Sequence, residues 1–390
     1  METRRERLRE DGHQIDQIAG CGTDLEPERL AGSIEGFIGY ARVPLGVAGP
    51  VRIRGSAAQG DFFMPFATTE GTLVASFQHA FNVINRCGGA GALCSDEQVT
   101  RAPCFEFANL EEAGEFARWL PGLLPQLQEI TAGTSRYCRL RSLHTSVIAN
   151  TVYVSFEFRT GDAAGQNMVT LATEAICKQL IERMPHRPRS WLVESVLSGD
   201  KRSSALAFRA TRGRNASAEV VVPARNLERY WRTDAHAMEQ CWNQAITGSA
   251  QTGSVGLQGN AANALAALFI ACGQDVACVA EAVTSVTRVE RTREGDIYFS
   301  VTLPNLIVGT VGGTYLPTAQ EYLRMLGCTG PGSATKFAEI CAVAVLAGNS
   351  RWSARWRRQR LRRRACRRRP QGPRRRRLPP ARRLPRPEGA

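Results

Sequence analysis

The chain lacks the features that would place it among membrane, secreted or metal-binding proteins. Its longest nearly apolar run, residues 261–272, is shorter than the roughly 20 residues that cross a bilayer, and it contains Asn263. The opening METRRERLRE carries charges of both signs with no apolar stretch behind it, so it predicts no secretory signal. The twelve cysteines form no C-x-x-C pair. We therefore expect a cytoplasmic protein with buried, reduced thiols and no metal site.

The composition is that of a folded protein with two structural units. Of the 390 residues, 43% are hydrophobic and 22% are charged, which excludes pervasive disorder. Single hydrophobic cores stop growing at about 250–300 residues, so a second unit is expected. The sequence shows no internal repeat.

The net charge of +14 comes from one end of the chain. Residues 351–390 hold 18 Arg, six Pro and a single Glu, whereas residues 1–350 hold 32 basic and 35 acidic side chains. The Arg-rich end has almost no aliphatic residues, so it is predicted to be disordered. A nucleic-acid or anionic-surface binder is the alternative that this charge suggests. We disfavour it because only Trp352 and Trp356 interleave the basic run with aromatic rings and the body is slightly acidic.

Hydrophobic periodicity predicts a mixed α/β chain with a compact α+β insert at residues 105–190. Residues 38–50 are dense in Gly and Pro and predict a loop with a closely packed backbone. A helix with a capped start is expected from Thr68 and Thr69 to the Gly88-Gly89 pair. Further predicted helices cover residues 110–127, 168–184, 260–271 and 334–347, and predicted strands cover 137–143, 147–158, 204–212, 216–222 and 296–308.

Polar residues gather at turns between these apolar elements. Taken alone, Glu70 behind two threonines is best explained as helix capping, and the Asp200-Lys201-Arg202 cluster as a solvated turn. Asp275 lies between an apolar helix and further apolar chain, so we expect it to be partly buried and to need a charged partner. Lys201 is the candidate partner.

Two further turns contain glycines. Residues 159–168 join a strand to a helix, and such a turn exposes backbone amides that can hold a phosphate. The sequence there is not G-x-G-x-x-G, so a Rossmann fold is not predicted. The glycines of residues 309–314 allow the backbone to approach another group closely.

Together these stretches resemble the hydroxymethylglutaryl-CoA (HMG-CoA) reductase family over roughly residues 35–348. The shared motifs, in the family's order, are IGYARVPLGVAGP at 38–50, PFATTEGTLVAS at 65–76, TSRY at 134–137, RTGDAAGQNMVT at 159–170, DK at 200–201, GSAQTGSVGLQGNAANALAALFIACGQD at 248–275 and GTVGGTYLP at 309–317. The ATTEG form is similar to the class I branch shared with eukaryotic enzymes, here without their membrane anchor.

The resemblance implies an α/β (α+β) fold and a domain organisation. Residues 1–102 and 194–350 would form a large substrate-binding domain, and residues 103–193 a small, inserted, ferredoxin-like NAD(P)-binding domain. Residues 351–390 would be a disordered Arg-rich tail. The resemblance also implies a homodimer or higher oligomer, with Lys201 and Asp275 facing Glu70 of the partner subunit. No membrane and no specific nucleic acid are expected as partners.

The implied activity is the NADPH-dependent reduction of (S)-3-hydroxy-3-methylglutaryl-CoA to mevalonate and CoA by two hydride transfers, a step of isoprenoid synthesis. Each transfer creates an oxyanion, which the Lys201 ammonium would stabilise; one such donor is typically worth about 3–4 kcal/mol. Glu70 matches the catalytic acid, whose pKa we expect burial to raise. Asp275 matches the acid that joins Lys201 and Glu70 in one hydrogen-bonded network.

The resemblance also assigns binding residues. Those implied for substrate are Arg101, which would bind the carboxylate, together with Asp200, Arg202, Arg225, Asn263 and, near CoA, Ser76, Gln78 and His79. Those implied for the dinucleotide are Ser135, Arg136, Tyr137, Asp162, Gly165, Gln166, Asn167, Met168 and Gly312, with Arg136 as the candidate for the 2′-phosphate.

Some positions depart from the family pattern. Cys278 replaces a glutamine, Arg202 and Arg225 replace lysines, and one glycine of GTVGGGT is missing. These changes look tolerable.

The C-terminus departs most. The family continues as A-G-E-L-S into a flap whose histidine protonates the leaving thiolate. Here Gly348 is followed by Asn349, and all five histidines lie upstream. GC-rich codons for this stretch can be chosen so that a one-nucleotide shift restores the family sequence, and we therefore hypothesise a frameshift. A genuine tail would impair turnover, and the alternative is a pseudoenzyme that binds the CoA ester without full turnover.

Overall fold

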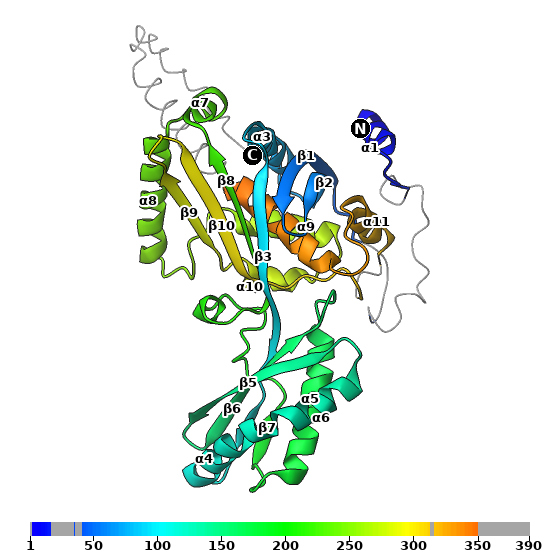
Figure 1. Cartoon of the computed structure of the whole chain (residues 1–390), viewed down its shortest axis with the longest axis vertical. Coiled ribbons are helices and arrows are strands. Elements are labelled where there is room, and N and C mark those ends of the chain that lie inside the picture. Colours follow the sequence, from blue (N-terminus) through cyan, green and yellow to red (C-terminus); the bar gives the residue numbers. More distant parts are fainter. Residues whose placement is uncertain (1, 17–34, 36–40, 313–315, 350–390) are drawn as a thin grey trace, which may run out of the picture.

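The computed structural model describes residues 2–16, 35, 41–312 and 316–349. These residues form an elongated molecule with a large upper part and a smaller lower part (Figure 1). Residues 38–40 of the predicted loop, Gly313 and the predicted disordered residues 351–390 lie outside the described residues. None of the described helices is both long and apolar enough to cross a bilayer.

Ten strands of the described chain form one continuous sheet in the order β7-β4-β6-β3-β8-β10-β9, with β5 beside β6, β1 beside β3 and β2 beside β1. Every pair is antiparallel except β1 with β3. The strands are β1 (Leu45–Gly55), β2 (Gln59–Ala67), β3 (Ala90–Arg101), β4 (Cys104–Glu106), β5 (Arg139–Ile148), β6 (Thr151–Arg159), β7 (Ser190–Leu192), β8 (Gly213–Val222), β9 (Val286–Arg291) and β10 (Ile297–Leu306).

Strand β3 connects the two parts of the molecule. Its residues from Gly91 to Gln98 pair with β8 in the upper part, and Val99 to Arg101 pair with β6 in the lower part. The strand runs from one part into the other in Figure 1. Arg101, at its end, therefore lies where the two parts meet.

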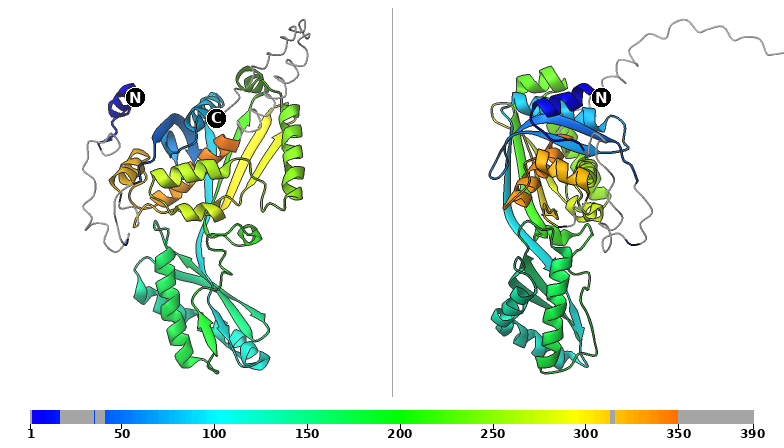
Figure 2. Two further views of the ribbon diagram at one scale, coloured as in Figure 1. Left: turned by 180° about the vertical axis from the view of Figure 1, so that it is seen from behind. Right: turned by 90° about the vertical axis from the view of Figure 1, so that its right-hand side faces the viewer.

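Helices cover one face of the upper sheet. In the rear view of Figure 2, α9 (Ala261–Ala271) and the helix at residues 333–349 lie in front of the strands. The α3 helix (Leu73–Arg86) packs against β1, and the Phe66 and Phe77 rings stack with centroids 4.3 Å apart. The remaining helices of this part are α7 (Ala224–Asn226), α8 (Ala235–Gln251), α10 (Val279–Ala282) and α11 (Pro317–Met325), while α1 (Glu2–Glu10) lies near the N-terminus.

The lower part has the element order β-α-β-β-α-β. Its helices are α4 (Leu110–Trp119), α5 (Leu124–Thr134) and α6 (Gln166–Arg183), and its strands lie in the order β7-β4-β6-β5. Alternate residues of β6 are buried, as period-two patterning requires, so Phe156 and Phe158 join the core. This order is that of a split β-α-β unit. The predicted mixed α/β class is confirmed.

Two predictions about the upper part were wrong. The helix predicted from Thr68 begins at Leu73, because β2 continues to Ala67 and Thr72 has a left-handed φ of 69°. Residues 204–212 were predicted as a strand, but Ala205–Phe208 forms a 3₁₀ helix, and β8 pairs with β3 and β10.

Three boundaries also differ from prediction. The helix predicted at 110–127 is interrupted by the 3₁₀ turn η1 (Leu120–Leu123), which carries Pro121 near its start. Val147 and Ile148 belong to β5 and not to the following strand. Leu45 to Pro50, predicted as loop, is the start of β1, although the predicted close packing is present: a Cβ on Gly49 would lie 2.7 Å from the Phe62 carbonyl oxygen.

Candidate active site

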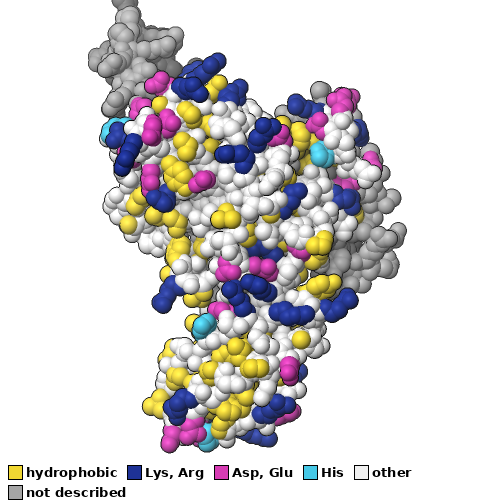
Figure 3. All heavy atoms as spheres, in the orientation of Figure 1, with side chains coloured by type: hydrophobic (Ala, Val, Ile, Leu, Met, Phe, Trp, Pro, Cys, Tyr) yellow, Lys and Arg dark blue, Asp and Glu magenta, His cyan; other side chains and the backbone are white. Residues whose placement is uncertain are grey.

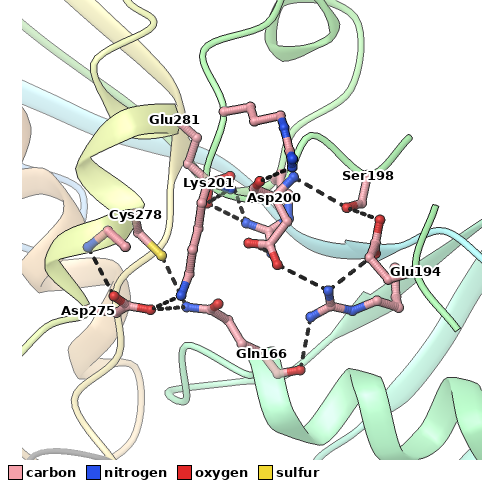
Figure 4. A network of polar contacts seen from close by, with 12 residues as sticks. Gln166, Glu194, Ser198, Asp200, Lys201, Asp275, Cys278 and Glu281 are labelled. Carbon is pink, nitrogen blue, oxygen red and sulfur yellow. Dashed lines mark hydrogen bonds and ion pairs between the residues drawn. The ribbon is translucent and has the colours of Figure 1, made fainter. Parts of the chain in front are cut away.

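An ammonium and a carboxylate meet at the centre of the site. Lys201 Nζ lies 2.9 Å from Asp275 Oδ2, as the sequence predicted (Figure 4). Asp275 lies four residues after the end of α9 at Ala271 and caps the 3₁₀ turn η4 (Val276–Cys278) by accepting a hydrogen bond from Ala277 N at 3.0 Å. The two side chains keep 44% and 39% of their surface exposed in the single chain. The pair is therefore held in place yet open to a ligand.

Each member of the pair stabilises the charge of the other. The hydrogen bond to Asp275 raises the pKa of the Lys201 ammonium, while partial burial lowers it less. Burial raises the pKa of Asp275, but the hydrogen bonds from Lys201 and Ala277 N outweigh it, so its pKa falls below the usual range. Both shifts keep the pair ionised at neutral pH.

Gln166 connects this pair to the lower part of the molecule. It is the first residue of α6, and its Nε2 donates to Asp275 Oδ2 at 3.3 Å and to Cys278 Sγ at 3.0 Å. Burial raises the pKa of the Cys278 thiol. Cys278 is therefore an acceptor for Gln166 in its neutral form, not a thiolate nucleophile.

A network of buried charges lies behind Lys201. Arg101 Nη1 donates to Glu194 Oε2 at 3.2 Å and to Asp200 Oδ2 at 3.1 Å, and its Nη2 donates to the Gln166 carbonyl at 3.3 Å. Arg212 contacts the other oxygen of Asp200 at 2.9 Å. Arg101 Nε has no hydrogen-bond partner among the described residues. Arg101, predicted to bind the substrate carboxylate, thus contacts Asp200, the residue before Lys201. Its Nε–H donor remains without a partner among the described residues.

The network at Arg212 continues to Glu281. Both Glu281 oxygens accept from Arg212 Nη1, at 2.5 and 2.6 Å. Ser198, whose hydroxyl donates to Glu194 at 3.0 Å, completes the cluster. Charged side chains of both signs also cover the surface where the two parts meet (Figure 3).

Glu70 lies at a different place in the chain. Its carboxylate accepts a hydrogen bond from Asn263 Nδ2, near the start of α9, whereas Lys201 and Asp275 lie beyond the end of that helix. A helix rises 1.5 Å per residue, so Asn263 and Ala271 alone are about 12 Å apart. Glu70 is exposed in the single chain, contrary to the expected burial. One chain therefore presents two separate groups of site residues.

A pocket of about 480 Å³ adjoins Glu70. It is lined by Gln78 and His79 from α3, two of the residues predicted near CoA. Gln78 Oε1 accepts from Gly49 N at 2.9 Å, which fixes the amide at the pocket wall. Ser76 is half-buried in the same helix but does not line this pocket.

Two predicted arginines differ in their position relative to the Lys201 pair. Arg212 and Arg225 flank opposite ends of β8. The ten residues of this strand, at about 3.3 Å each, separate the two arginines. Arg202 is exposed and donates to the Asp200 carbonyl at 3.3 Å. The structure does not bring Arg225 together with Lys201 within one chain.

The predicted dinucleotide residues form two groups. Ser135, Arg136 and Tyr137 follow α5, where Arg136 and Tyr137 are exposed and the Arg136 Cζ lies 5.6 Å from the Tyr137 ring centroid. Gly165, Gln166, Asn167 and Met168 open α6, with Asn167 exposed and Met168 packed against the core.

Glycines bring two turns of this region together. A Cβ on Gly165 would lie 2.4 Å from Thr160 Cγ2, and a Cβ on Gly309 would lie 2.3 Å from Ala164 N. Ala163 bridges to Val311 beside them. Gly312, with φ of 70°, has open space around it among the described residues. The predicted close approach of the 309–314 backbone is confirmed at Gly309 but not at Gly312.

Asp162 contacts the last helix. Its carboxylate accepts from Gly332 N and Ala334 N, both at 2.8 Å, at the start of the helix at 333–349. In this structure, Asp162 therefore connects the turn before α6 to that helix.

Three charged residues of the network were missed by the sequence analysis: Glu194, Arg212 and Glu281. Arg212 and Glu281 are 69 positions apart and stand in no motif, so no spacing signals their pairing. Glu281 follows the apolar and small residues after Asp275, which is the same signal of a buried acid that identified Asp275 itself.

Comparison with known proteins agrees with this architecture. The family model described as hydroxymethylglutaryl-coenzyme A reductase matches residues 1–354. A 3-hydroxy-3-methylglutaryl-coenzyme A reductase of Pyrococcus horikoshii is 40% identical over 333 residues, which is 83% of this chain and 80% of that protein. The reductase mlcD of Penicillium citrinum is 38% identical over 82% of this chain and 28% of its own length.

Solved structures match the fold as well. The class II 3-hydroxy-3-methylglutaryl-CoA reductase of Streptococcus pneumoniae, bound to NADPH in open conformations, superposes with a TM-score of 0.69 over 90% of this chain and 96% of that one. Its sequence identity is 20%, so this match concerns the fold alone. Fold and site together define a two-part α/β protein with a split β-α-β unit inserted into a larger sheet. The chain belongs to the hydroxymethylglutaryl-coenzyme A reductase family.

Proposed function

We propose that this chain reduces (S)-3-hydroxy-3-methylglutaryl-CoA to mevalonate and CoA with two equivalents of NADPH. The observation that carries the proposal is the Lys201–Asp275 pair, 2.9 Å apart and in contact with the first residue of α6, in a chain of this family. Two successive hydride transfers at one carbon each place negative charge on the same oxygen. A fixed, ionised ammonium is the group that such an oxygen requires.

In this proposal Lys201 is the oxyanion donor and its neighbours orient it. Asp275 accepts from Lys201 Nζ, and Gln166 steadies the same carboxylate oxygen. The ammonium is thereby directed before substrate arrives, so little reorganisation accompanies the reaction. Arg101, which Asp200 orients by accepting from it at 3.1 Å, would bind the substrate carboxylate beside it, together with Arg202.

Glu70 is the proposed acid, supplied by the partner subunit. Glu70 contacts Asn263 near the start of α9, whereas Lys201 contacts Asp275 beyond the end of that helix, so a single thioester carbon cannot touch both in one chain. A homodimer with sites between subunits resolves this separation. The segments that flank Lys201 and Asp275 in the sequence carry exposed apolar side chains, as an interface would require: Val196, Leu197, Leu206, Phe208, Ile270 and Val276.

The partner's contribution would include the rest of the Glu70 group. Asn263 and Arg225 would contact the substrate from that side, and the pocket lined by Gln78 and His79, with Ser76 close by, would receive CoA. Covering the pocket would also bury Glu70 and exclude water from it, as a closed active site requires.

The residues at the α6 start fit a dinucleotide. Gly165 caps the start of α6, where a Cβ would clash with Thr160. With no side chain at this position, the first backbone amides of the 18-residue helix can approach a phosphate. NADPH, when bound, supplies the hydride. Ser135, Arg136, Tyr137, Asn167, Met168 and Gly312 would hold it, with Asp162 shaping the turn. The domain division follows: a ferredoxin-like cofactor domain at 103–193 within a substrate domain of 1–102 and 194–350.

Replacing Arg136 by alanine should separate the two nicotinamide dinucleotides. An exposed guanidinium bonded to a charged group contributes about 1.5–3 kcal/mol, so KM for NADPH should rise about 10–100-fold. KM for NADH should change little, because NADH lacks the 2′-phosphate. Steady-state kinetics with both nucleotides measures this, with Arg183→Ala on the α6 surface as the control. Equal effects on both nucleotides would remove Arg136 from the 2′-phosphate site.

We infer the class I-like form of the family from sequence identity. The chain is 38% identical to the Penicillium citrinum reductase and 20% identical to the class II structure. We also propose a cytoplasmic location, because the twelve cysteines are scattered singly along the sequence with no C-x-x-C pair, as is typical of reduced thiols.

We further propose that residues from Asn349 onward are a frameshifted reading. Asn349 is buried, with its Oδ1 accepting from Asn260 N and its Nδ2 donating to Thr287 Oγ1 at 2.9 Å. The family motif has a glutamate at this position. Its two carboxylate oxygens could accept hydrogen bonds from the same two groups, Asn260 N and the Thr287 hydroxyl, because a threonine hydroxyl can donate as well as accept. Sequencing the gene around Gly348 decides this. Independent reads that keep the Asn349 codon in frame would contradict it.

The activity is tested by following NADPH oxidation with the CoA ester and, separately, with mevaldehyde. Mevaldehyde reduction needs no thiolate to leave, so it measures the site independently of the C-terminal histidine. We expect oxidation with mevaldehyde to be the less affected by the present tail, since loss of a general acid costs about 10²–10⁴ in rate. No oxidation with either substrate would contradict the proposed function and favour a binding-only protein.

A further inference from the structure

Lys201 has an unusual backbone conformation. Its φ is 55°, in the left-handed region that residues with side chains seldom occupy. Such a conformation persists only where surrounding contacts impose it. One contact is a hydrogen bond from Lys201 N to Glu281 Oε1 at 3.2 Å. Glu281 is therefore in direct contact with the backbone that aims the ammonium.

Glu281 is itself held rigidly inside the protein. Its side chain is fully buried, and both of its oxygens accept from Arg212 Nη1. Burial raises the pKa of the Glu281 carboxyl, and the neighbouring Arg212 charge opposes that shift. A buried carboxylate that accepts three hydrogen bonds from two fixed donor atoms, Lys201 N and Arg212 Nη1, has little freedom to move.

A second connection passes through Arg212. Its side chain is 2% exposed, and its Nη2 lies 2.9 Å from Asp200 Oδ1, although this contact is an ion pair without an aligned hydrogen bond. Asp200 immediately precedes Lys201 and also binds Arg101. Glu281 is thus connected to Lys201 in two ways. It accepts a hydrogen bond from Lys201 N directly, and it is linked through Arg212 to Asp200, the residue before Lys201.

We propose that Glu281 is a positioning residue for the reduction, which fixes the direction of the Lys201 ammonium by holding Lys201 N and, through Arg212, Asp200. This inference rests on the proposed function. The proposed role depends on the two carboxylate oxygens of Glu281 and not only on the volume of its side chain, because Lys201 N and Arg212 together donate three hydrogen bonds to these oxygens.

The test is Glu281→Gln. An amide has one acceptor oxygen, so either Lys201 N or Arg212 Nη1 must then face an N–H group, while the shape is kept. A misplacement of about 1 Å at a reacting group can cost up to about 10²-fold in rate, so we expect kcat to fall about 10–100-fold. KM for the CoA ester should stay within about threefold, because the ammonium acts on charge that develops in the transition state.

Glu339→Gln is the matched control. Glu339, in the helix at 333–349, is another fully buried glutamate among the described residues. Like Glu281 it accepts from backbone amides, here Ala57 N, Ala58 N and Cys94 N. Both variants should lose thermal stability, but only Glu281→Gln should lose kcat. If Glu281→Gln does not fold, Glu281→Asp keeps the charge beside Arg212 and withdraws it from Lys201 N, with the same expected loss.

The outcomes are distinct. A kcat for the Glu281 variant at least tenfold below that of the Glu339 variant, with KM retained, supports the proposal. Equal kcat values for the two variants overturn it. If the unmodified chain and the Glu339 variant both fail to oxidise NADPH with mevaldehyde, the proposed function has failed instead.

Discussion

Lys201→Ala is expected to lower kcat by about 10²–10³-fold, because one oxyanion donor contributes that much in comparable sites. KM for the CoA ester should change far less, since the ammonium binds the charge that develops during reduction and not the neutral ground-state carbonyl. The loss should affect the CoA ester and mevaldehyde alike, because both hydride transfers place charge on an oxygen at the same position. NADPH oxidation under single-turnover conditions measures it.

The chain offers a close control for this substitution. Lys201 is one of only three lysines, with Lys178 and Lys336. Lys178 is exposed on α6 and paired with Glu174 at 2.6 Å, so Lys178→Ala should leave kcat unchanged. A Lys201→Ala variant that retains kcat within about threefold would show that another group receives the charge, and the oxyanion account of Lys201 would be wrong.

Glu70→Gln is expected to lower kcat by about 10²–10⁴-fold, the range for loss of a general acid. The substituted amide keeps a carbonyl oxygen that can accept from Asn263 Nδ2, so the contact to α9 survives and only the transferable proton is lost. The pH profile should lose the limb that the unmodified chain owes to this carboxyl. Rates measured across pH with the unmodified and substituted chains reveal that change.

Glu182→Gln, an exposed position on α6, controls for the loss of one acidic group. It should alter neither kcat nor the pH profile. A Glu70→Gln variant that keeps both the rate and the profile of the unmodified chain would assign the proton donor to another residue.

The pairing of Lys201 with Asp275 could be predicted because apolar sequence on both sides of an acid implies some burial, and a buried acid needs a partner. The pairing of Arg212 with Glu281 could not, although it is the better buried of the two. Its members meet because α10, which contains Glu281, packs against β10, and β10 pairs with β8, the strand that follows Arg212. Glu70 was expected to be buried but is exposed in the single chain, and in the proposed dimer the partner subunit would supply its cover.

The fold was predictable where one local pattern dominated. The helix at 261–271 and strand β6 carry clear periodicity and were placed within a few residues. The strand prediction for residues 204–212 was wrong because Leu206 and Phe208 alternate with smaller residues as in a half-buried strand, yet both side chains are exposed in the single chain. The hairpin between β5 and β6 turns at Ala149, with φ of 51°, where no glycine marks the turn.

The most direct test is to combine the two damaged chains. Lys201→Ala and Glu70→Gln chains, co-expressed with different affinity tags and purified as the mixed dimer, should contain one site with both residues intact. NADPH oxidation should then recover to about half of the unmodified rate per dimer, because a twofold dimer has two equivalent sites. A mixed dimer no more active than either damaged homodimer would place Glu70 and Lys201 in the same chain's site, and the account of a shared catalytic centre would be wrong.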